Sequence, residues 1–380
     1  MSEFSVHPSA LDRFADVIGS ANGGSTLDAK YLIDYGNYVE EHLHLDGPGL
    51  VFGWIKPRVE EIRQRLSTDS TTISTHLIES AMGLTASASD YRRTDAAQAS
   101  RLDSVYKPTG VTAADDGYQA GGTTTDPATA LTPPSEEGGM PSLVQELLDA
   151  GGVFSVSDLV IKILRWCGLD IMGWVTDHLA GSPSELAKVK SALENLASFD
   201  QDAATVVGDG AATMFGSWTG NAADAAHGYF DKTASALTDH GTAISGVATK
   251  MQALIIGIQE GMAALEGALT IAIDAAIKAA VAVAAAGCLA EVPGIDVLAA
   301  IVGAAEVANV VGKVRKFFDI WNVVWASHEG ILGLITGLVG TLQGYDVSSS
   351  LPTSGYYNAS QGSAPSYGGN DVPARPGRPR

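Results

Sequence analysis

The sequence is poor in cysteine, in basic residues and in long uninterrupted apolar runs. Its 380 residues contain two cysteines, Cys167 and Cys288, which are too few for a disulfide framework or a cysteine zinc site. The two thiols either pair with each other or stay as separate buried thiols. Acidic residues outnumber basic ones by 43 to 23, and the net charge is −20. This charge argues against nucleic acid as a partner, because phosphate binding needs a basic patch.

No segment has the pattern of a transmembrane helix or of a secretory signal peptide. A membrane span needs about 18 consecutive apolar residues, and the uncharged runs at 279–290 and 330–345 are shorter than that. We interpret these runs as buried or amphipathic helices. The N-terminus lacks both a basic start and an apolar stretch, so export would require a route that does not read such a peptide.

Apolar residues recur every three or four positions through most of the chain, which predicts an all-α fold without convincing strands. The first unit, 1–106, begins with a helix after His7-Pro8-Ser9, and a turn at 46–49 precedes a long second arm. This pattern predicts a helical hairpin. The apolar stripe of the long arm is Ile55, Val59, Ile62, Leu66, Ile73, Leu77, Leu84, Ala88 and Tyr91.

A change of composition separates the first unit from a second one. Residues 107–140 are rich in Gly, Thr and Pro, which predicts a flexible linker. The second unit, 141–344, carries helical patterns at 142–149, 157–180, 183–216, from 221 onward, 295–325 and 328–343. Its two long stripes are Leu186, Val189, Leu193, Leu196, Ala203, Val206 and Val207, then Ala226, Phe230, Leu237, Ile244, Val247 and Met251. The Ser/Gly/Tyr/Pro-rich residues 345–380 predict a disordered tail.

Two short motifs lie at the ends of these long helices. Tyr91 and Asp95 are four residues apart near the end of the first unit's long arm, so both project from one helical face. Trp218 and Gly220, in Trp-Thr-Gly, fall between the two long helical patterns of the second unit, where glycine allows a tight turn. Taken singly, the first motif is also compatible with a solvated helix end and the second with an ordinary turn.

Together, Tyr91-x-x-x-Asp95 and Trp218-x-Gly220 resemble the WXG family of type VII (ESX) secretion substrates from actinobacteria and related Gram-positive bacteria. The first unit is similar to the EspC-like secretion-associated proteins, and the other unit resembles an EspA-type WXG partner. Each unit carries the motif that the other lacks. The resemblance therefore suggests one chain that fuses two substrates, packed as a four-helix bundle with extra apolar helices, with Trp218 beside Tyr91.

The resemblance implies a non-enzymatic protein, cytoplasmic before export and then secreted or held at the cell envelope. Tyr91, Asp95, Trp218 and Gly220 would form the export signal, read by the ATPase of the type VII apparatus. A chaperone, a small WXG partner and self-association remain open as further interactions. The resemblance implies no cofactor. Residues 262–343 would serve self-assembly or membrane contact, since their alanine and glycine content permits close helix packing.

The other function classes have weaker support from the sequence. His42 and His44 lie near Glu40 and Glu41, but two residues apart on a helix they point in different directions, so we expect no metal site. No nucleophile-elbow, phosphate-loop or zinc-protease motif occurs. One alternative is the targeting scaffold of a polymorphic toxin, although few residues follow the last helix. Another is a membrane-active, pore-forming effector that uses residues 262–343.

Overall fold

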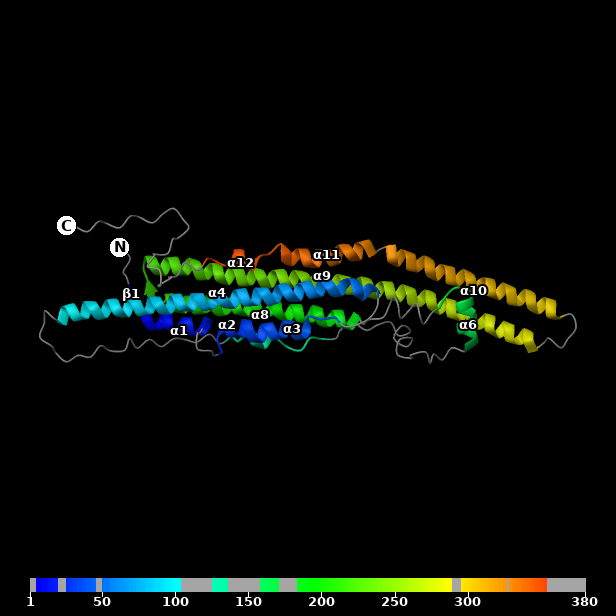
Figure 1. Ribbon diagram of the computed structural model, residues 1–380, viewed down its shortest axis with the longest axis horizontal. Helices are drawn as coiled ribbons and strands as arrows, with labels where there is room; N and C mark the ends of the chain where they lie inside the picture. The colour runs from blue at the N-terminus through cyan, green and yellow to red at the C-terminus, as the bar shows by residue number, and fades with distance from the viewer. Residues whose placement is uncertain are drawn as a thin grey trace.

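The computed structural model describes residues 5–19, 25–45, 50–103, 125–135, 158–170, 183–288, 295–326 and 328–353. Almost all of these residues are helical, which confirms the predicted all-α class. The molecule is elongated, with its long helices running side by side along one axis (Figure 1). No helix among the described residues has the length and apolar character needed to cross a membrane.

The first unit is built on one very long helix. Its elements are α1 (Pro8–Ile18), α2 (Leu27–Ala29), the π-helix η1 (Lys30–Tyr35), α3 (Gly36–His42) and α4 (Leu50–Asp103). Pro8 occupies the first turn of α1, as the sequence predicts, and α1 to α3 pack along α4. Gly19, just after α1, allows a close approach, because a Cβ there would lie 3.0 Å from the carbonyl oxygen of Leu77.

The second unit contains two helices that match the long predicted arms. They are α8 (Pro183–Phe215) and α9 (Asn221–Cys288), followed by α10 (Ile295–Ala326), α11 (His328–Gln343) and the short α12 (Val347–Ser350). Of the earlier predicted helices, 142–149 lies outside the described residues, and α6 (Asp158–Trp166) falls within 157–180. Helices α8 and α9 make the most extensive contact in the structure.

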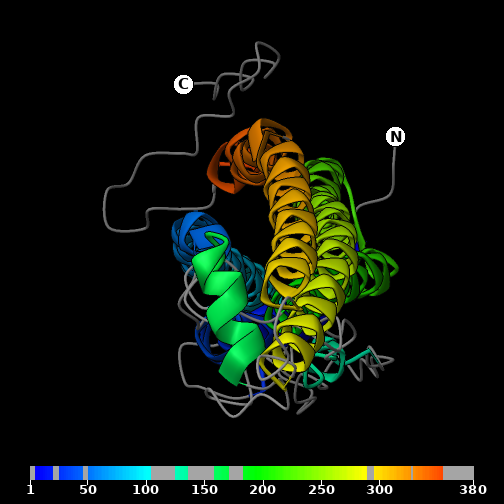
Figure 2. The same cartoon turned by 90° about the vertical axis from the view of Figure 1, so that its right-hand side faces the viewer.

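Helix α9 belongs to two regions of the molecule. Its first half lies beside α8 and α4, and its second half continues past them as an arm together with α10 (Figures 1 and 2). Helix α6 packs against both helices of this arm. We call residues 256–288 of α9, with α10 and α6, the distal arm. Exposed large apolar side chains gather there, including Ile271, Val281 and Val323.

Three findings lie outside the sequence-based predictions. First, β1 (Ser5–Val6) pairs antiparallel with β2 (Trp218–Thr219) in a two-stranded ribbon. Second, residues 125–135, within the predicted linker, include the 3-10 helix η2 (Pro127–Ala130), which packs on α8. Third, the disordered tail was predicted to begin too early, because residues 345–353 pack on α4 and α9 with Val347 and Leu351 buried.

Of the two cysteines, Cys167 is a free, half-buried thiol whose pKa is raised by burial. The side chain of Cys288 lies outside the described residues.

Candidate functional site

The turn between α8 and α9 is shaped by glycine and held by the N-terminal strand. Gly220 has a φ of +116°, a backbone conformation that side chains with a Cβ rarely adopt. Its carbonyl oxygen accepts a hydrogen bond from the backbone N–H of Asp224 at 2.9 Å, and α9 starts there. Val6 pairs with Trp218, and the N–H of His7 donates to the carbonyl oxygen of Ser217 at 3.1 Å. The turn is thus fixed on both sides.

Trp218 lies inside this end of the bundle. Its side chain is buried, and its ring stacks on Phe215 with centroids 5.9 Å apart. The indole N–H has no hydrogen-bond partner among the described residues, a cost that a well-packed ring must offset. Phe215 also contacts the ring of His227 at 4.9 Å. Trp218 is therefore part of the packing at this end of the molecule.

The structure brings Tyr91 and Trp218 together. Their ring centroids are 6.2 Å apart at an interplanar angle of 75°, an edge-to-face contact. Arg92, next to Tyr91, forms an ion pair with Asp12 of α1 at 2.6 Å. We call this region, where α4, the α8–α9 turn and β1 meet, the Trp218 end.

Asp95 and Gly220 differ from the two aromatic residues in exposure and role. Asp95 lies one helical turn beyond Tyr91 and is exposed on α4, so it is accessible to a partner. Gly220 supplies the backbone conformation of the turn. Of the four residues that the motifs single out, two form the aromatic contact, one shapes the turn and one is exposed beside it.

A second polar feature lies deep in the bundle. His240 of α9 is fully buried, and its Nδ1 lies 2.7 Å from Oδ2 of Asp200 on α8. Its Nε2 lies 3.4 Å from Oδ2 of Asp69 on α4. Arg65 donates to the same Asp69 oxygen at 3.1 Å, and Tyr31 of η1 donates to Oδ1 of Asp200 at 2.7 Å. We call Tyr31, Arg65, Asp69, Asp200 and His240 the charged layer.

Electrostatics keep His240 protonated in this layer. Burial by itself lowers its pKa, but the charge and hydrogen bond of Asp200, with the neighbouring Asp69 carboxylate, raise it to about 9. Burial and the neighbouring Asp200 carboxylate raise the pKa of Tyr31 well above its usual value, so the phenol remains a donor. Two carboxylates thus face two cations, His240 and Arg65, and the charges balance.

A neutral polar layer lies closer to the Trp218 end. The hydroxyl of Tyr229 is 2.7 Å from Oγ of Ser80 and 3.2 Å from Nε2 of His76, which in turn is 3.3 Å from the Thr233 hydroxyl. Burial lowers the pKa of His76 to about 4, and burial raises that of Tyr229 to about 12. Both rings are therefore uncharged at neutral pH. We call His76, Ser80, Tyr229 and Thr233 the neutral layer.

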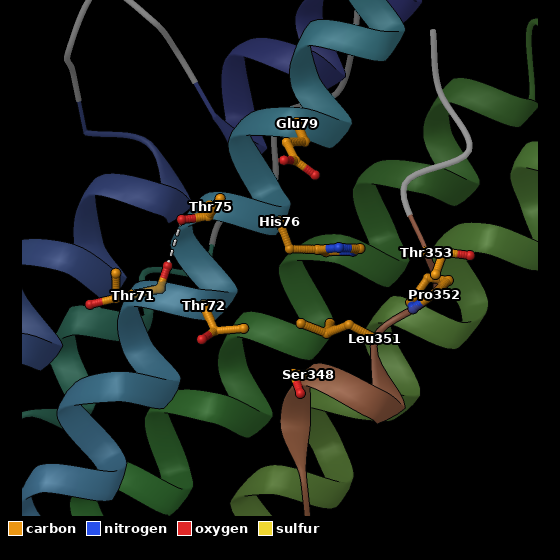
Figure 3. A pocket seen from close by; sticks show the side chains of 9 residues that line it. All are labelled: Thr71, Thr72, Thr75, His76, Glu79, Ser348, Leu351, Pro352 and Thr353. Carbon is orange, nitrogen blue, oxygen red and sulfur yellow. Dashed lines mark hydrogen bonds between the residues drawn. The ribbon is translucent and has the colours of Figure 1, made fainter. Parts of the chain in front are cut away.

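A pocket of about 380 Å³ opens between α4 and the segment around α12 (Figure 3). The hydroxyls of Thr71, Thr72 and Thr75 on its wall donate to carbonyl oxygens one turn earlier in α4. His76, also on the wall, directs its Nε2 to Tyr229 and Thr233. The threonine hydroxyls of the pocket wall are thus engaged within α4, and His76 is engaged with α9.

Among the described residues, no group of three or more His, Cys, Asp or Glu side chains is arranged so that it could hold a metal ion. His42 packs edge-to-face on Tyr38, with centroids 4.4 Å apart. His240 and the charged layer were not predicted from the sequence. The sequence feature that could have revealed this layer is a titratable residue at a buried position in each of the helices α4, α8 and α9.

Comparisons with protein-family models, with curated proteins and with solved structures returned no match.

Proposed function

We propose that this protein is a substrate or secretion-associated protein of a type VII (ESX) secretion system, non-enzymatic and exported by a composite signal. The observation that carries the proposal is the contact between Tyr91 and Trp218, 6.2 Å apart between ring centroids. Each residue belongs to one of the two motifs that resemble the family, and the two motifs lie 127 residues apart in the sequence.

The surroundings of this contact support a recognition role. Beyond Tyr91, residues 92–98 of α4 are exposed, and Asp95 lies among them. A partner such as the secretion ATPase would bind this exposed helix end beside the turn that Gly220 shapes. The same arrangement fits a chain in which two substrates are fused, since α4 comes from the first unit and Trp218 from the second.

An export assay in the native host tests the proposal. Culture filtrate and cell lysate would be compared by immunoblotting for the wild type, Tyr91→Ala, Asp95→Ala and Trp218→Ala, with a cytosolic protein as a lysis marker. We expect the wild type in the filtrate and the three variants in the lysate. Asp209→Ala, which removes an exposed carboxylate from α8, is the matched control and should be exported.

Folding must be separated from recognition in this assay. Asp95 is exposed, so its replacement should leave the helical circular dichroism and the unfolding midpoint unchanged. Trp218→Phe keeps a buried ring and serves as the folded partner of Trp218→Ala. Export of folded Tyr91→Ala and Asp95→Ala at the wild-type level would contradict the proposal.

One observation favours the alternative of a membrane-active effector. Seven of the ten exposed large apolar side chains among the described residues lie on the distal arm or on α11. Such clustering is typical of a contact surface for a membrane or for another protein. Leakage of dye from liposomes, lost in an Ile271→Ser and Val281→Ser double variant, would support this function. Leu32→Ser and Ile33→Ser, exposed in the first unit, are the controls.

A further inference from the structure

Helices α4 and α9 are paired antiparallel in one continuous register. Four contacts join them: Tyr91 with Trp218, Ser80 with Tyr229, His76 with Thr233, and Asp69 with His240. Going from one contact to the next, the steps along α4 are 11, 4 and 7 residues, and those along the α9 side are also 11, 4 and 7. Asp69 therefore lies 22 residues before Tyr91, and His240 lies 22 residues after Trp218.

The apolar faces of these helices do not define that register by themselves. Leu66 and Ile73 on α4 are one heptad apart, as are Leu237 and Ile244 on α9, and all four are buried. A stripe that repeats every seven residues packs almost equally well after a slip of one heptad, about 10.5 Å along the axis. Only side chains that differ from the repeat can distinguish the native alignment from the slipped one.

The charged layer brings polar residues of three helices together at one level. Asp69 on α4 and His240 on α9 lie midway between buried apolar residues that are seven apart, and on α8 Asp200 follows buried Phe199. A slip of one heptad between α4 and α9 would separate Asp69 from His240. In one direction Asp69 would face Val247 and His240 would face His76, and in the other they would face Thr233 and Ile62. Either slip takes a buried charge away from its charged partner. Gly241 strengthens the alignment of α8 with α9, since a Cβ there would lie 2.8 Å from the carbonyl oxygen of Ala197.

We propose that the charged layer is a register lock, which aligns the first unit with the second and thereby holds Tyr91 against Trp218, about 33 Å away along the helices. Its members act as positioning residues, since none of them touches the Trp218 end. The register itself is independent of the proposed function. Its consequence for export rests on that function.

The test measures the register directly in the full chain. Spin labels are attached to cysteines at Thr68 of α4 and Ala253 of α9, both exposed, in a background where Cys167 and Cys288 are serine. Distances are measured by double electron–electron resonance. The labelled protein with the wild-type charged layer should give one narrow distribution of distances between the two labels. The apolar variant Tyr31→Phe, Asp69→Leu, Asp200→Leu, His240→Leu should stay helical but show a second distance from a slip of about 10.5 Å.

Two further variants keep the test decisive. Asp69→Leu alone leaves the Asp200–His240 pair intact, so it should fold even if the four-site variant does not, and it should also show the second distance. Ile73→Leu with Ile244→Leu changes one buried apolar residue on each side of the charged layer and should keep the single native distance. A single native distance in both layer variants would overturn the register lock.

The same layer variants, without labels, then enter the export assay. A slipped register together with loss of export supports both the lock and the composite signal. A slipped register with normal export supports the lock and contradicts the proposed function, because Tyr91 and Trp218 would no longer meet. An unchanged register contradicts the lock whatever the export result, and the Tyr91→Ala variant then tests the proposed function separately.

Discussion

The charged layer and the neutral layer lie at neighbouring levels of the same helix pair, one heptad apart on α4 and on α9, yet their histidines hold opposite protonation states. His240 is flanked by two carboxylates and keeps its proton up to a pKa of about 9. His76 is flanked by hydroxyl groups, and burial lowers its pKa to about 4. Burial disfavours the charged form at both sites, so the difference comes from the partners.

This comparison shows two ways of keeping polar groups inside a helical bundle. The neutral layer satisfies its groups with hydrogen bonds and carries no net charge. The charged layer depends on each charge being present, because removing one partner leaves another buried and unpaired. The charged layer should therefore be the more sensitive of the two to substitution and should respond to pH on the alkaline side.

The largest expected effect is the loss of one carboxylate from the charged layer. Asp200→Ala removes the closest partner of His240 and the acceptor of the Tyr31 hydroxyl. We expect the free energy of unfolding to fall by about 3–5 kcal/mol, measured by urea denaturation followed by circular dichroism. Asp209→Ala on the exposed face of α8 should change it by less than about 0.5 kcal/mol. Equal effects of the two variants would mean that Asp200 contributes no more to stability than an exposed carboxylate.

The second prediction concerns alkaline pH and His240. Its folded pKa, about 9, lies above the value of 6.5 in the unfolded chain, so the folded state binds more protons between these values. The stabilisation is complete below about pH 6.5 and is lost as the pH rises through 9, a change on the order of 3 kcal/mol. Denaturation midpoints measured from pH 6.5 to 9 should fall accordingly.

The groups that face His240 are Asp69, Asp200 and, through its ring, Tyr345 at 5.9 Å. His240→Gln should flatten the alkaline slope, since it removes the titrating group. His227→Gln, at an exposed ion pair on the same helix, should leave the slope as in the wild type. A wild-type slope in the His240 variant would mean that another group titrates in this range.

The third prediction concerns acidic pH and His76. Its folded pKa, about 4, lies below the unfolded value, so the unfolded chain takes up the proton first. The stabilisation from the neutral ring is complete above about pH 6.5 and is lost as the pH falls toward 4, a change on the order of 3 kcal/mol. The difference in unfolding free energy between the wild type and His76→Gln, followed over this range, isolates the contribution of this ring from the carboxylates that also titrate.

Much of the helical layout could be predicted from the sequence. The apolar stripes defined α4, α8 and α9, and the end of α10 and the limits of α11 lie close to the predicted ones. The charged layer could not be seen in the same way, because periodicity analysis counts apolar residues and treats a charge as a gap. Such gaps run from Leu66 to Ile73 on α4 and from Leu237 to Ile244 on α9, and they are the sign of the layer in the sequence. On α8 no gap marks it, because buried Phe199 lies beside Asp200.

The structure of the Trp218 end was also only partly predictable from the sequence. The motifs placed Tyr91 and Trp218 at one end of a predicted bundle, which is where the structure has their contact. The β1–β2 ribbon was not predictable, because two residues per strand carry no alternating pattern and their pairing depends on how α1 packs. The packing of residues 345–353 was not predicted for a similar reason, because two buried apolar residues, Val347 and Leu351, are too few to show a helical periodicity.

The smallest predicted effect lies at the edge of the charged layer. Arg65 is shared between buried Asp69 and exposed Asp346, 3.3 Å away, and Asp346 also caps α12 through the N–H of Ser348. Asp346→Ala should lower the free energy of unfolding by less than any of the changes above, because the helix that it caps is short and the lost ion pair is half exposed. Asp346→Asn keeps an acceptor for the cap and loses only the charge, so it should cost less. Suppose that Asp346→Ala lowered the free energy of unfolding as much as Asp200→Ala does. The charged layer would then depend on Asp346 for its charge balance, and residues 345–353 would be part of the register lock.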